Sequence, residues 1–313
     1  MNSDAALEIS HLCKRFAADT VVNDLSFRIE PGEVFGLLGP NGAGKSTTIN
    51  MIAGVTRIDA GTISIFGYDN RREYRHTRQM TGVMHQEIVT DSFFTIDRAL
   101  DLHPGYYGVR LDPLWRDRLV DRLGLGPHLH KPMIKLSGGL KRRFMVAKAL
   151  IHKPRLLIVD EPTAGVDVEL RHSLWEFVQE INAAGTTVLL TTHYLEEAQQ
   201  MCGRLAILNQ GELIALEETS SLLRRLGRRT LRVRLAAALT EMPADLAARG
   251  GELGEEGHLL TLPLPPGENP GRILQQICTA GLEVADLETI AADLEDVFID
   301  LTGIAASQNG GGQ

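Results

Sequence analysis

The most informative stretch of this chain reads Gly39-Pro40-Asn41-Gly42-Ala43-Gly44-Lys45-Ser46-Thr47. Two glycines separated by four residues and followed by Lys and a hydroxyl residue form a phosphate-loop pattern. An apolar run over residues 34–38 precedes the loop and a helical stretch over residues 47–53 follows it, as the pattern requires. We therefore predict that residues 39–47 bind a nucleoside triphosphate, with Lys45 on its phosphates and Ser46 as a ligand of Mg²⁺. A glycine-rich turn without a ligand is the alternative.

Two adjacent carboxylates form the second candidate site. The segment Asp160-Glu161-Pro162-Thr163 follows the apolar run of residues 156–159, which is typical of a strand buried on both faces of a parallel sheet. Ligands of such sheets bind at the carboxyl ends of the strands. We predict that Asp160 holds Mg²⁺ and that Glu161 polarises the water that attacks the γ-phosphate. The alternative is an acidic pair that stabilises a helix start.

The composition narrows the class of protein. The 313 residues carry a formal net charge of −8, which argues against a nucleic-acid partner. The three cysteines, Cys13, Cys202 and Cys278, are far apart, so they indicate neither a disulfide framework nor a zinc site but a reducing cytosol. The chain begins without a secretion signal and contains no apolar run long enough to span a bilayer. If it moves something across a membrane, another chain must supply the path.

Apolar runs that alternate with helical patterns predict an α/β core. Residues 90–150 have a mostly helical pattern, with breaks expected at Pro104-Gly105, Gly124 to Pro127 and Pro132. The strands expected around this helical insert cover residues 7–9, 21–29, 61–67, 156–159 and 187–190.

The chain is expected to divide near residue 225. Residues 1–225 form the nucleotide-binding domain, and residues 226–303 a small α+β domain with a Pro-rich turn at Pro263 to Pro266. The polar, glycine-rich residues 304–313 are expected to be a disordered tail.

The motifs taken together resemble the nucleotide-binding subunit of ATP-binding cassette (ABC) transporters. The tetrapeptide Leu136-Ser137-Gly138-Gly139 stands at the place of the family's signature, between the two nucleotide motifs. The resemblance covers about residues 7–220. It implies a P-loop NTPase core, similar to RecA, with an N-terminal antiparallel β subdomain and a helical insert, and it implies ATP and Mg²⁺ as ligands.

Further residues match the family by position. Gln86 would couple Mg²⁺ and water to the helical insert, His193 would contact the γ-phosphate, and Phe16 would stack on adenine. Ala164-Gly165-Val166-Asp167 stands at the D-loop. The alternatives are a solvent-exposed Gln, a structural His and a core Phe.

The signature implies a partner. Ser137 is a good helix N-cap, and Gly138 and Gly139 expose amides at a helix start, where anions bind. In the family the phosphate loop and the signature of one site come from opposite protomers, so a homodimer or a paralogous ABC-domain partner is implied. A helix cap with no nucleotide role is the alternative. Leu140 stands where the family usually has Gln, as in many exporters with ABC-2 type permeases.

The resemblance therefore implies an ATP-hydrolysing subunit that powers export through a separate ABC-2 type permease. It would bind peripherally to that permease at the cytoplasmic face of the cell membrane. Import is the alternative, followed by a soluble cassette ATPase that acts on DNA or ribosomes. The aromatic residues of the insert would meet the permease or pack in the core, and the C-terminal piece, similar to the accessory domain of drug, lipid or polysaccharide exporters, would stabilise the dimer. The transported compound cannot be read from this chain.

Overall fold

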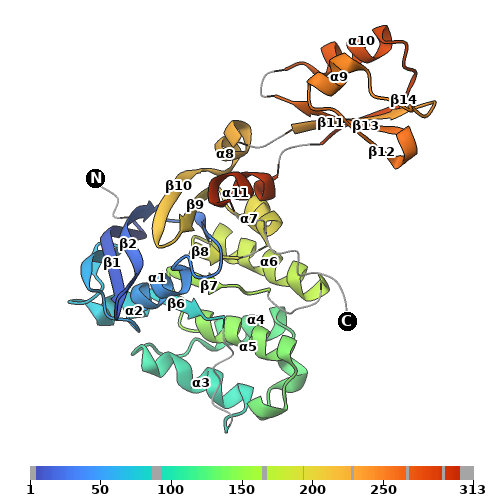
Figure 1. Ribbon diagram of the computed structural model, residues 1–313. Coiled ribbons are helices and arrows are strands. Elements are labelled where there is room, and N and C mark those ends of the chain that lie inside the picture. The colour runs from blue at the N-terminus through green and yellow to red at the C-terminus, as the bar shows by residue number, and fades with distance from the viewer. Residues whose placement is uncertain are drawn as a thin grey trace. The chain divides into compact units, whose positions relative to one another are not determined.

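The computed structural model describes residues 5–86, 93–163, 168–192, 194–226, 229–265, 268–290 and 293–303 (Figure 1). Tertiary contacts divide the chain into a first unit, Met1–Glu218, and a second unit, Thr219–Gln313. The sequence places this boundary near residue 225, whereas the contacts place helix α8 (Thr219–Leu226) with the second unit. The expected disordered tail lies outside the described residues.

A six-stranded sheet forms the centre of the first unit. Its strand order is β10-β9-β3-β8-β7-β6, and all neighbours are parallel except β10, which pairs antiparallel with β9. The two apolar runs predicted to be buried strands are β7 and β8, and every residue of both is buried. The strands span Val34–Leu38 (β3), Thr81–Met84 (β6), Leu156–Asp160 (β7), Thr187–Thr191 (β8), Arg204–Asn209 (β9) and Glu212–Glu218 (β10). Because β3, β6, β7 and β8 are parallel, their carboxyl ends meet at one edge of the sheet.

An antiparallel sheet completes the strands of the first unit. Its order is β2-β1-β4-β5, and the strands span Leu7–Phe16 (β1), Asp19–Ile29 (β2), Ala60–Ile65 (β4) and Tyr68–Asp69 (β5). Alternate residues of β1 and β2 are buried, and they share a hydrophobic core with Phe35, Leu37 and Ile49 of the phosphate-loop region. The predicted antiparallel β subdomain is therefore packed directly against the nucleotide motif.

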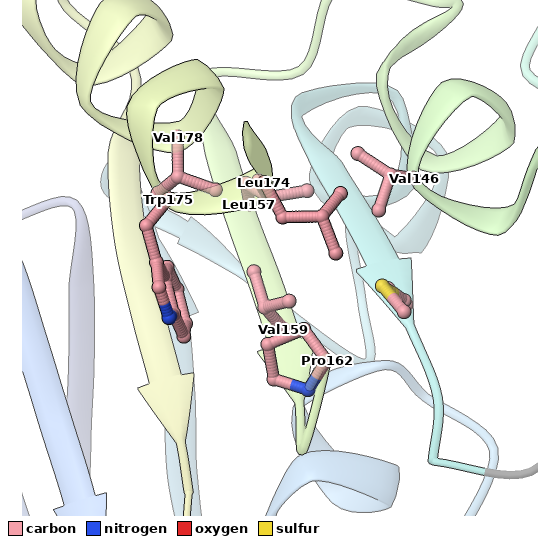
Figure 2. Close-up of a pocket in the computed structure, with 8 residues that line it drawn as sticks. Val146, Leu157, Val159, Pro162, Leu174, Trp175 and Val178 are labelled. Carbon is pink, nitrogen blue, oxygen red and sulfur yellow. The ribbon is translucent and has the colours of Figure 1, made fainter. Parts of the chain in front are cut away.

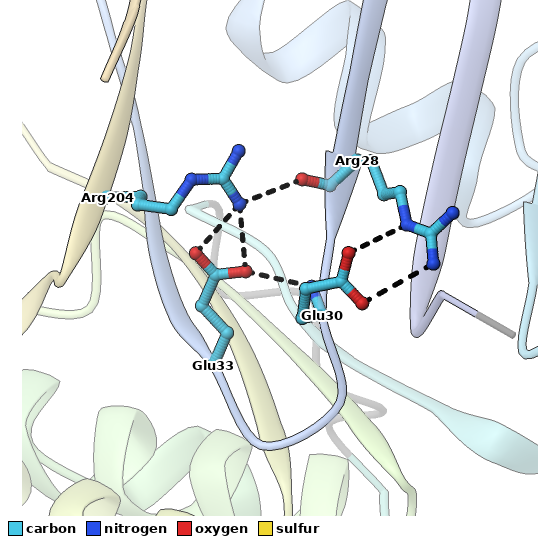
Figure 3. Close-up of polar contacts among 4 residues, drawn as sticks. All are labelled: Arg28, Glu30, Glu33 and Arg204. Atoms are coloured by element: carbon cyan, nitrogen blue, oxygen red, sulfur yellow. Dashed lines mark hydrogen bonds and ion pairs between the residues drawn. The ribbon is translucent and has the colours of Figure 1, made fainter. Parts of the chain in front are cut away.

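One arginine connects the turn between the two sheets to the parallel sheet (Figure 3). Arg204, the first residue of β9, donates from Nη1 to the Arg28 carbonyl oxygen and lies 3.1 Å from Glu33 Oε1. Glu33 Oε2 in turn accepts a 2.8 Å hydrogen bond from the Glu30 backbone N–H. The turn that leads from β2 into β3 is therefore held in place ahead of the phosphate loop.

Besides these strands, the first unit contains α-helices. They span Lys45–Ile52 (α1), Tyr74–Met80 (α2), Ile96–Tyr106 (α3), Pro113–Arg122 (α4), Gly138–Leu150 (α5), Val168–Ala183 (α6) and Leu195–Met201 (α7). Helices α3, α4 and α5 lie together and form the predicted helical insert (Figure 1). No described helix has both the length and the apolar character that a membrane span needs.

One of the three predicted helix breaks in the insert is wrong. Helix α3 continues through Pro104 to Tyr106. Proline removes the hydrogen bond to the carbonyl four residues earlier, but here the helix ends two residues later, so little of it is disturbed. The breaks at Gly124 to Pro127 and at Pro132 are confirmed, because α4 ends at Arg122 and α5 begins at Gly138.

Besides α8, the second unit contains a four-stranded antiparallel sheet, two α-helices that connect its strands, and a final helix. The elements follow in the order Arg229–Leu235 (β11), Ala244–Ala248 (α9), Glu252–Gly254 (β12), Leu259–Leu264 (β13), Pro270–Thr279 (α10) and Val284–Ile290 (β14), and α11 (Leu294–Thr302) ends the described chain. The strand order β12-β13-β11-β14 with this β-α-β-β-α-β succession is a ferredoxin-like arrangement, as the α+β prediction allows. The turn predicted at Pro263 is wrong, because Pro263 lies in β13 and pairs with Thr230 of β11. The pairing of β13 with β12 stops at Thr261, so no strand on that side needs a backbone N–H from Pro263.

Candidate active site

The phosphate loop lies between β3 and α1 and is packed closely against its neighbours. A Cβ atom on Gly44, whose φ is +99°, would lie 2.6 Å from the Val21 carbonyl oxygen. A Cβ atom on Gly39 would lie 2.5 Å from the Leu208 carbonyl oxygen. Both positions therefore require glycine, and β2 and β9 fix the course of the loop.

Lys45 folds back over this loop. Its Nζ donates to the carbonyl oxygens of Gly39, at 2.6 Å, and Pro40, at 3.1 Å, and the residue is 6% exposed. Burial lowers the pKa of Lys45, while the carboxylates of Glu161 and Asp160 act in the opposite direction. The ammonium group is thus within electrostatic reach of both predicted catalytic carboxylates.

Asp160 ends strand β7 and is 4% exposed. It pairs in register with Thr191 of β8, whose hydroxyl donates to Asp160 Oδ1. Burial of a carboxylate is costly unless hydrogen bonds or opposite charges compensate it. Here the Thr191 hydroxyl and the nearby charge of Lys45 provide that compensation at the carboxyl edge of the sheet.

Glu161 lies where the chain leaves the strand. Its φ of +48° is uncommon for a residue other than glycine, and its backbone N–H donates to the Thr191 carbonyl oxygen at 3.0 Å. Gln86, two residues after β6, donates from Nε2 to Glu161 Oε2 at 2.7 Å. Two residues predicted to act together but 75 positions apart in the sequence are therefore in direct contact.

An apolar layer supports the carboxylate segment from one side (Figure 2). Leu174, Trp175 and Val178 of α6 face Leu157 and Val159 of β7, with Pro162 at the end of the strand. The gap between them has a volume of about 10 Å³, which is at most the space of one water molecule. The dense packing holds the end of β7, and with it Asp160, in one position.

Arg142 is a site residue that the sequence analysis missed. It lies on α5, is 5% exposed, and donates from Nη1 to the Gln86 carbonyl oxygen at 2.8 Å. Burial lowers the pKa of Arg142, and the carboxylates of Glu161 and Asp160 oppose that shift. The available signal was periodicity, because Arg142 shares the buried face of α5 with Met145 and Val146.

The signature segment begins helix α5. The predicted N-cap is confirmed, since the Ser137 Oγ accepts a hydrogen bond from the Leu140 backbone N–H at 3.3 Å. Ser137 and Gly138 are exposed, and Gly139 is half-buried. Their contact with the nucleotide of a partner chain remains a prediction.

Of the remaining predicted residues, Phe16 is among the described ones. Phe16, the last residue of β1, is 49% exposed and carries the Lys14 ammonium 4.9 Å from its ring centroid, so it is not a core residue. Its stacking on adenine remains a prediction. Residues 164–167 and His193 lie outside the described residues.

The predicted Mg²⁺ ligands have the donor atoms that this ion prefers. Ser46, Asp160 and Gln86 supply hydroxyl, carboxylate and amide oxygens, the hard donors that Mg²⁺ prefers. Gln86 uses its nitrogen toward Glu161, so that bond does not occupy its oxygen. Within the described ranges no cluster of three or more His, Cys, Asp or Glu residues could hold a metal ion. The donor set fits Mg²⁺.

Comparison with known proteins agrees with this geometry. Residues 22–164 match the ABC transporter family. The chain is 37% identical over 307 residues to the Nod factor export ATP-binding protein I of Paraburkholderia xenovorans (strain LB400), covering 96% of this chain and 98% of that protein. It is 39% identical over 227 residues to the linearmycin resistance ATP-binding protein LnrL of Bacillus subtilis (strain 168), covering 72% and 73%.

A solved structure supports the same assignment. The ATP-binding subunit of an ABC transporter is 32% identical, with a TM-score of 0.66, and the match covers 70% of this chain and 92% of that subunit. The predicted P-loop NTPase fold with an antiparallel β subdomain is thereby confirmed. This chain belongs to the ABC transporter family, as one of its ATP-binding proteins.

Proposed function

We propose that this chain, an ATP-hydrolysing ABC subunit that uses ATP and Mg²⁺, powers export through a separate ABC-2 type membrane permease. The observation that carries the catalytic part is the contact between Gln86 and Glu161 beside Asp160 and Lys45. These groups come from different elements and meet at the edge of the sheet where the phosphate loop begins. The arrangement suits phosphoryl transfer to water, which needs positioning and charge stabilisation more than covalent chemistry.

The roles follow from the chemistry of each group. Lys45 would exchange its bonds to the Gly39 and Pro40 carbonyls for bonds to phosphate oxygens. Glu161, oriented by Gln86, would take the proton of the attacking water, and His193 would orient the γ-phosphate. Bound Mg²⁺, held by Ser46, Asp160 and Gln86, would supply positive charge to the phosphates.

We further propose that the site is completed by a second chain. One chain has one phosphate loop and one signature, and the exposed N-terminus of α5 at Ser137 offers backbone N–H groups to an anion. A head-to-tail pair would place the signature of each chain over the nucleotide of the other, giving two sites per dimer. The partner would be an identical chain or a paralogue.

Export is favoured by the relatives and by the signature. One relative is named for Nod factor export and another for linearmycin resistance, and Leu140 matches the pattern of ABC-2 type exporters. In the helical insert, Phe93 is 93% exposed and Tyr106 is 79% exposed, so these aromatics are available to a permease. The subunit would act at the cytoplasmic face of the membrane, bound peripherally to that permease.

Replacing Glu161 by Gln tests the catalytic part of the proposal. The variant keeps the shape of the side chain but loses the base, so it should accumulate an ATP-bound dimer and turn over little ATP, measured by phosphate release and gel filtration. Wild-type turnover in Glu161→Gln would remove this residue from catalysis.

Purification from the native host tests the transport part. The chain should co-purify with a permease, and Tyr106→Asp should abolish that association while the ATPase activity of the isolated protein persists. Recovery with a substrate-binding protein would indicate import, and recovery without any permease would indicate a DNA or ribosome factor; either outcome would contradict export.

A further inference from the structure

A buried carboxylate that none of the roles above uses lies on helix α7. Glu197 is 6% exposed, and its Oε2 accepts two hydrogen bonds. One comes from the Thr163 hydroxyl at 3.0 Å and the other from the Thr192 hydroxyl at 2.8 Å. Both threonines are 1% exposed, so water does not replace these bonds readily.

The two threonines occupy significant positions in the chain. Thr163 follows Glu161 by two residues, and Thr192 directly precedes His193. Two hydrogen bonds of Thr191 already join the ends of β7 and β8. Its hydroxyl donates to Asp160, and its carbonyl oxygen accepts from the Glu161 backbone N–H. Glu197 adds a second connection, because it binds Thr163 after the end of β7 and Thr192 after the end of β8.

The other oxygen of Glu197 faces helix α6. Arg171 Nε lies 3.4 Å from Glu197 Oε1, and its guanidinium lies 4.4 Å from the ring centroid of Tyr194. Among the described residues neither Arg171 Nε nor Glu197 Oε1 has a hydrogen-bond partner, so their contact is electrostatic. The carboxylate therefore connects the segment after β7, the segment after β8, and α6.

We propose that Glu197 is a positioning residue for ATP hydrolysis. The positive φ of Glu161 is a conformation that persists only when the structure on both sides determines it. Thr191 holds the backbone at Glu161 itself, and the bond from Thr163 to Glu197 holds it two residues later. Glu197 thus fixes the segment that carries the base relative to the segment that continues into His193. This inference rests on the catalytic roles proposed for Glu161 and His193.

The experiment compares two neighbouring glutamates on the same helix in the full-length protein. Glu197→Ala removes the buried acceptor, and Glu196→Ala, at an exposed position, is the matched control. Loss of a group that orients a catalytic residue costs about tenfold to a hundredfold in rate. We expect kcat to fall by that factor in Glu197→Ala, with KM for ATP changed less than about threefold, and no change in Glu196→Ala.

Conservative variants separate positioning from a merely structural role. Glu197→Gln retains an oxygen that can accept both hydroxyls, although it loses the charge that faces Arg171, and should recover most of the kcat that Glu197→Ala loses. Thr163→Val should lower kcat without altering ATP-dependent dimerisation, whereas Thr163→Ser should retain activity. If Glu197→Ala fails to fold, the comparison of Thr163→Val with Thr163→Ser decides the question.

Two results would overturn the inference. One is a kcat in Glu197→Ala within twofold of Glu196→Ala. The other is a Glu197→Ala variant that loses ATP affinity and thermal stability together with its activity, while Glu197→Gln recovers none of the three. Full turnover in Glu161→Gln would instead refute the proposed catalytic roles, so the two failures are distinguishable.

Discussion

Each unit of this chain places an arginine near carboxylates, and one of these two arginines is buried while the other is exposed. In the first unit Arg142 is 5% exposed and bonded to the backbone of Gln86, within electrostatic reach of Asp160 and Glu161. In the second unit Arg234 forms a 2.9 Å ion pair with Glu255, and both side chains are 52% exposed. It also lies opposite Asp286 on the neighbouring strand.

The difference shows that burial, and not residue type, separates a reactive cluster from a solvated face. Charges taken out of water interact strongly and hold one another in fixed positions, whereas exposed pairs are screened. The first unit can therefore use its charges for chemistry. In the second unit, Arg234 and Glu255 are both about half exposed, so their attraction is screened by water.

The largest effect is expected at Lys45. Lys45→Ala removes a buried ammonium that donates to two carbonyls of the phosphate loop and interacts with the charges of Glu161 and Asp160. ATP turnover should fall by at least about a hundredfold to a thousandfold, the usual cost of losing a group that stabilises transition-state charge. Phosphate release at saturating ATP measures it, and turnover within tenfold of wild type would show that the burial of this lysine has no catalytic purpose.

The second largest effect is expected at the buried Arg142. Arg142→Met keeps the apolar stem but removes the donor to the Gln86 carbonyl, so Gln86 should lose its orientation toward Glu161. We expect turnover to fall about tenfold to a hundredfold. The same replacement at Arg234 is the matched control and should leave turnover unchanged; equal effects in the two variants would break the comparison.

The buried His152 should make the stability of the fold depend on pH. His152 is 4% exposed, stacks on Tyr107, and burial lowers its pKa to about 4. Between pH 6.5 and pH 4 the unfolded chain binds this proton and the folded chain does not, so stability falls as the pH falls. The free energy of unfolding should drop by up to about 1.4 kcal/mol per pH unit from this group.

Urea unfolding at pH 7 and pH 5 measures the effect. His152→Phe keeps the stacking but has no titrating group, and should reduce the pH dependence relative to the wild type. An unchanged pH dependence in this variant would assign the effect to other groups.

The smallest effect is expected for the exposed ion pair. Arg234→Ala should change the free energy of unfolding of the chain by less than about 1 kcal/mol, because exposed pairs are screened and cost side-chain entropy. Thermal unfolding at low and high salt measures it. A larger loss would show that the sheet face of the second unit is more than a solvated surface.

Local patterns predicted much of the fold and of the site. The phosphate loop, the buried strands β7 and β8, and the cap at Ser137 depend on neighbouring residues, so spacing was enough to find them. The contact of Gln86 with Glu161 joins distant elements and was not predicted, because the family resemblance gave Gln86 only a role toward Mg²⁺ and water. The break at Pro104 was wrong, because a proline near a helix end disturbs few hydrogen bonds.

Contacts between distant elements could not be predicted from the sequence. Lys141, Arg142 and Arg143 have the same charge; helical periodicity indicates that Arg142 lies on the buried face of α5, but its bond to the Gln86 carbonyl depends on tertiary packing. Glu196 and Glu197 are likewise adjacent and chemically identical, yet one faces water and the other faces two threonine hydroxyls. Which of two like residues is buried beside the site is set by the tertiary fold.

A mixing experiment tests the central claim that buried charges of one chain act on ATP only when a facing chain closes the site. Lys45→Ala has a damaged phosphate loop and Ser137→Arg a damaged signature, and each should be inactive alone. Half of the dimers in an equal mixture pair the two variants, and each of these has one intact site. Turnover should therefore return to about a quarter of wild type. A mixture as inactive as its components, or full activity of Ser137→Arg alone, would contradict the composite site.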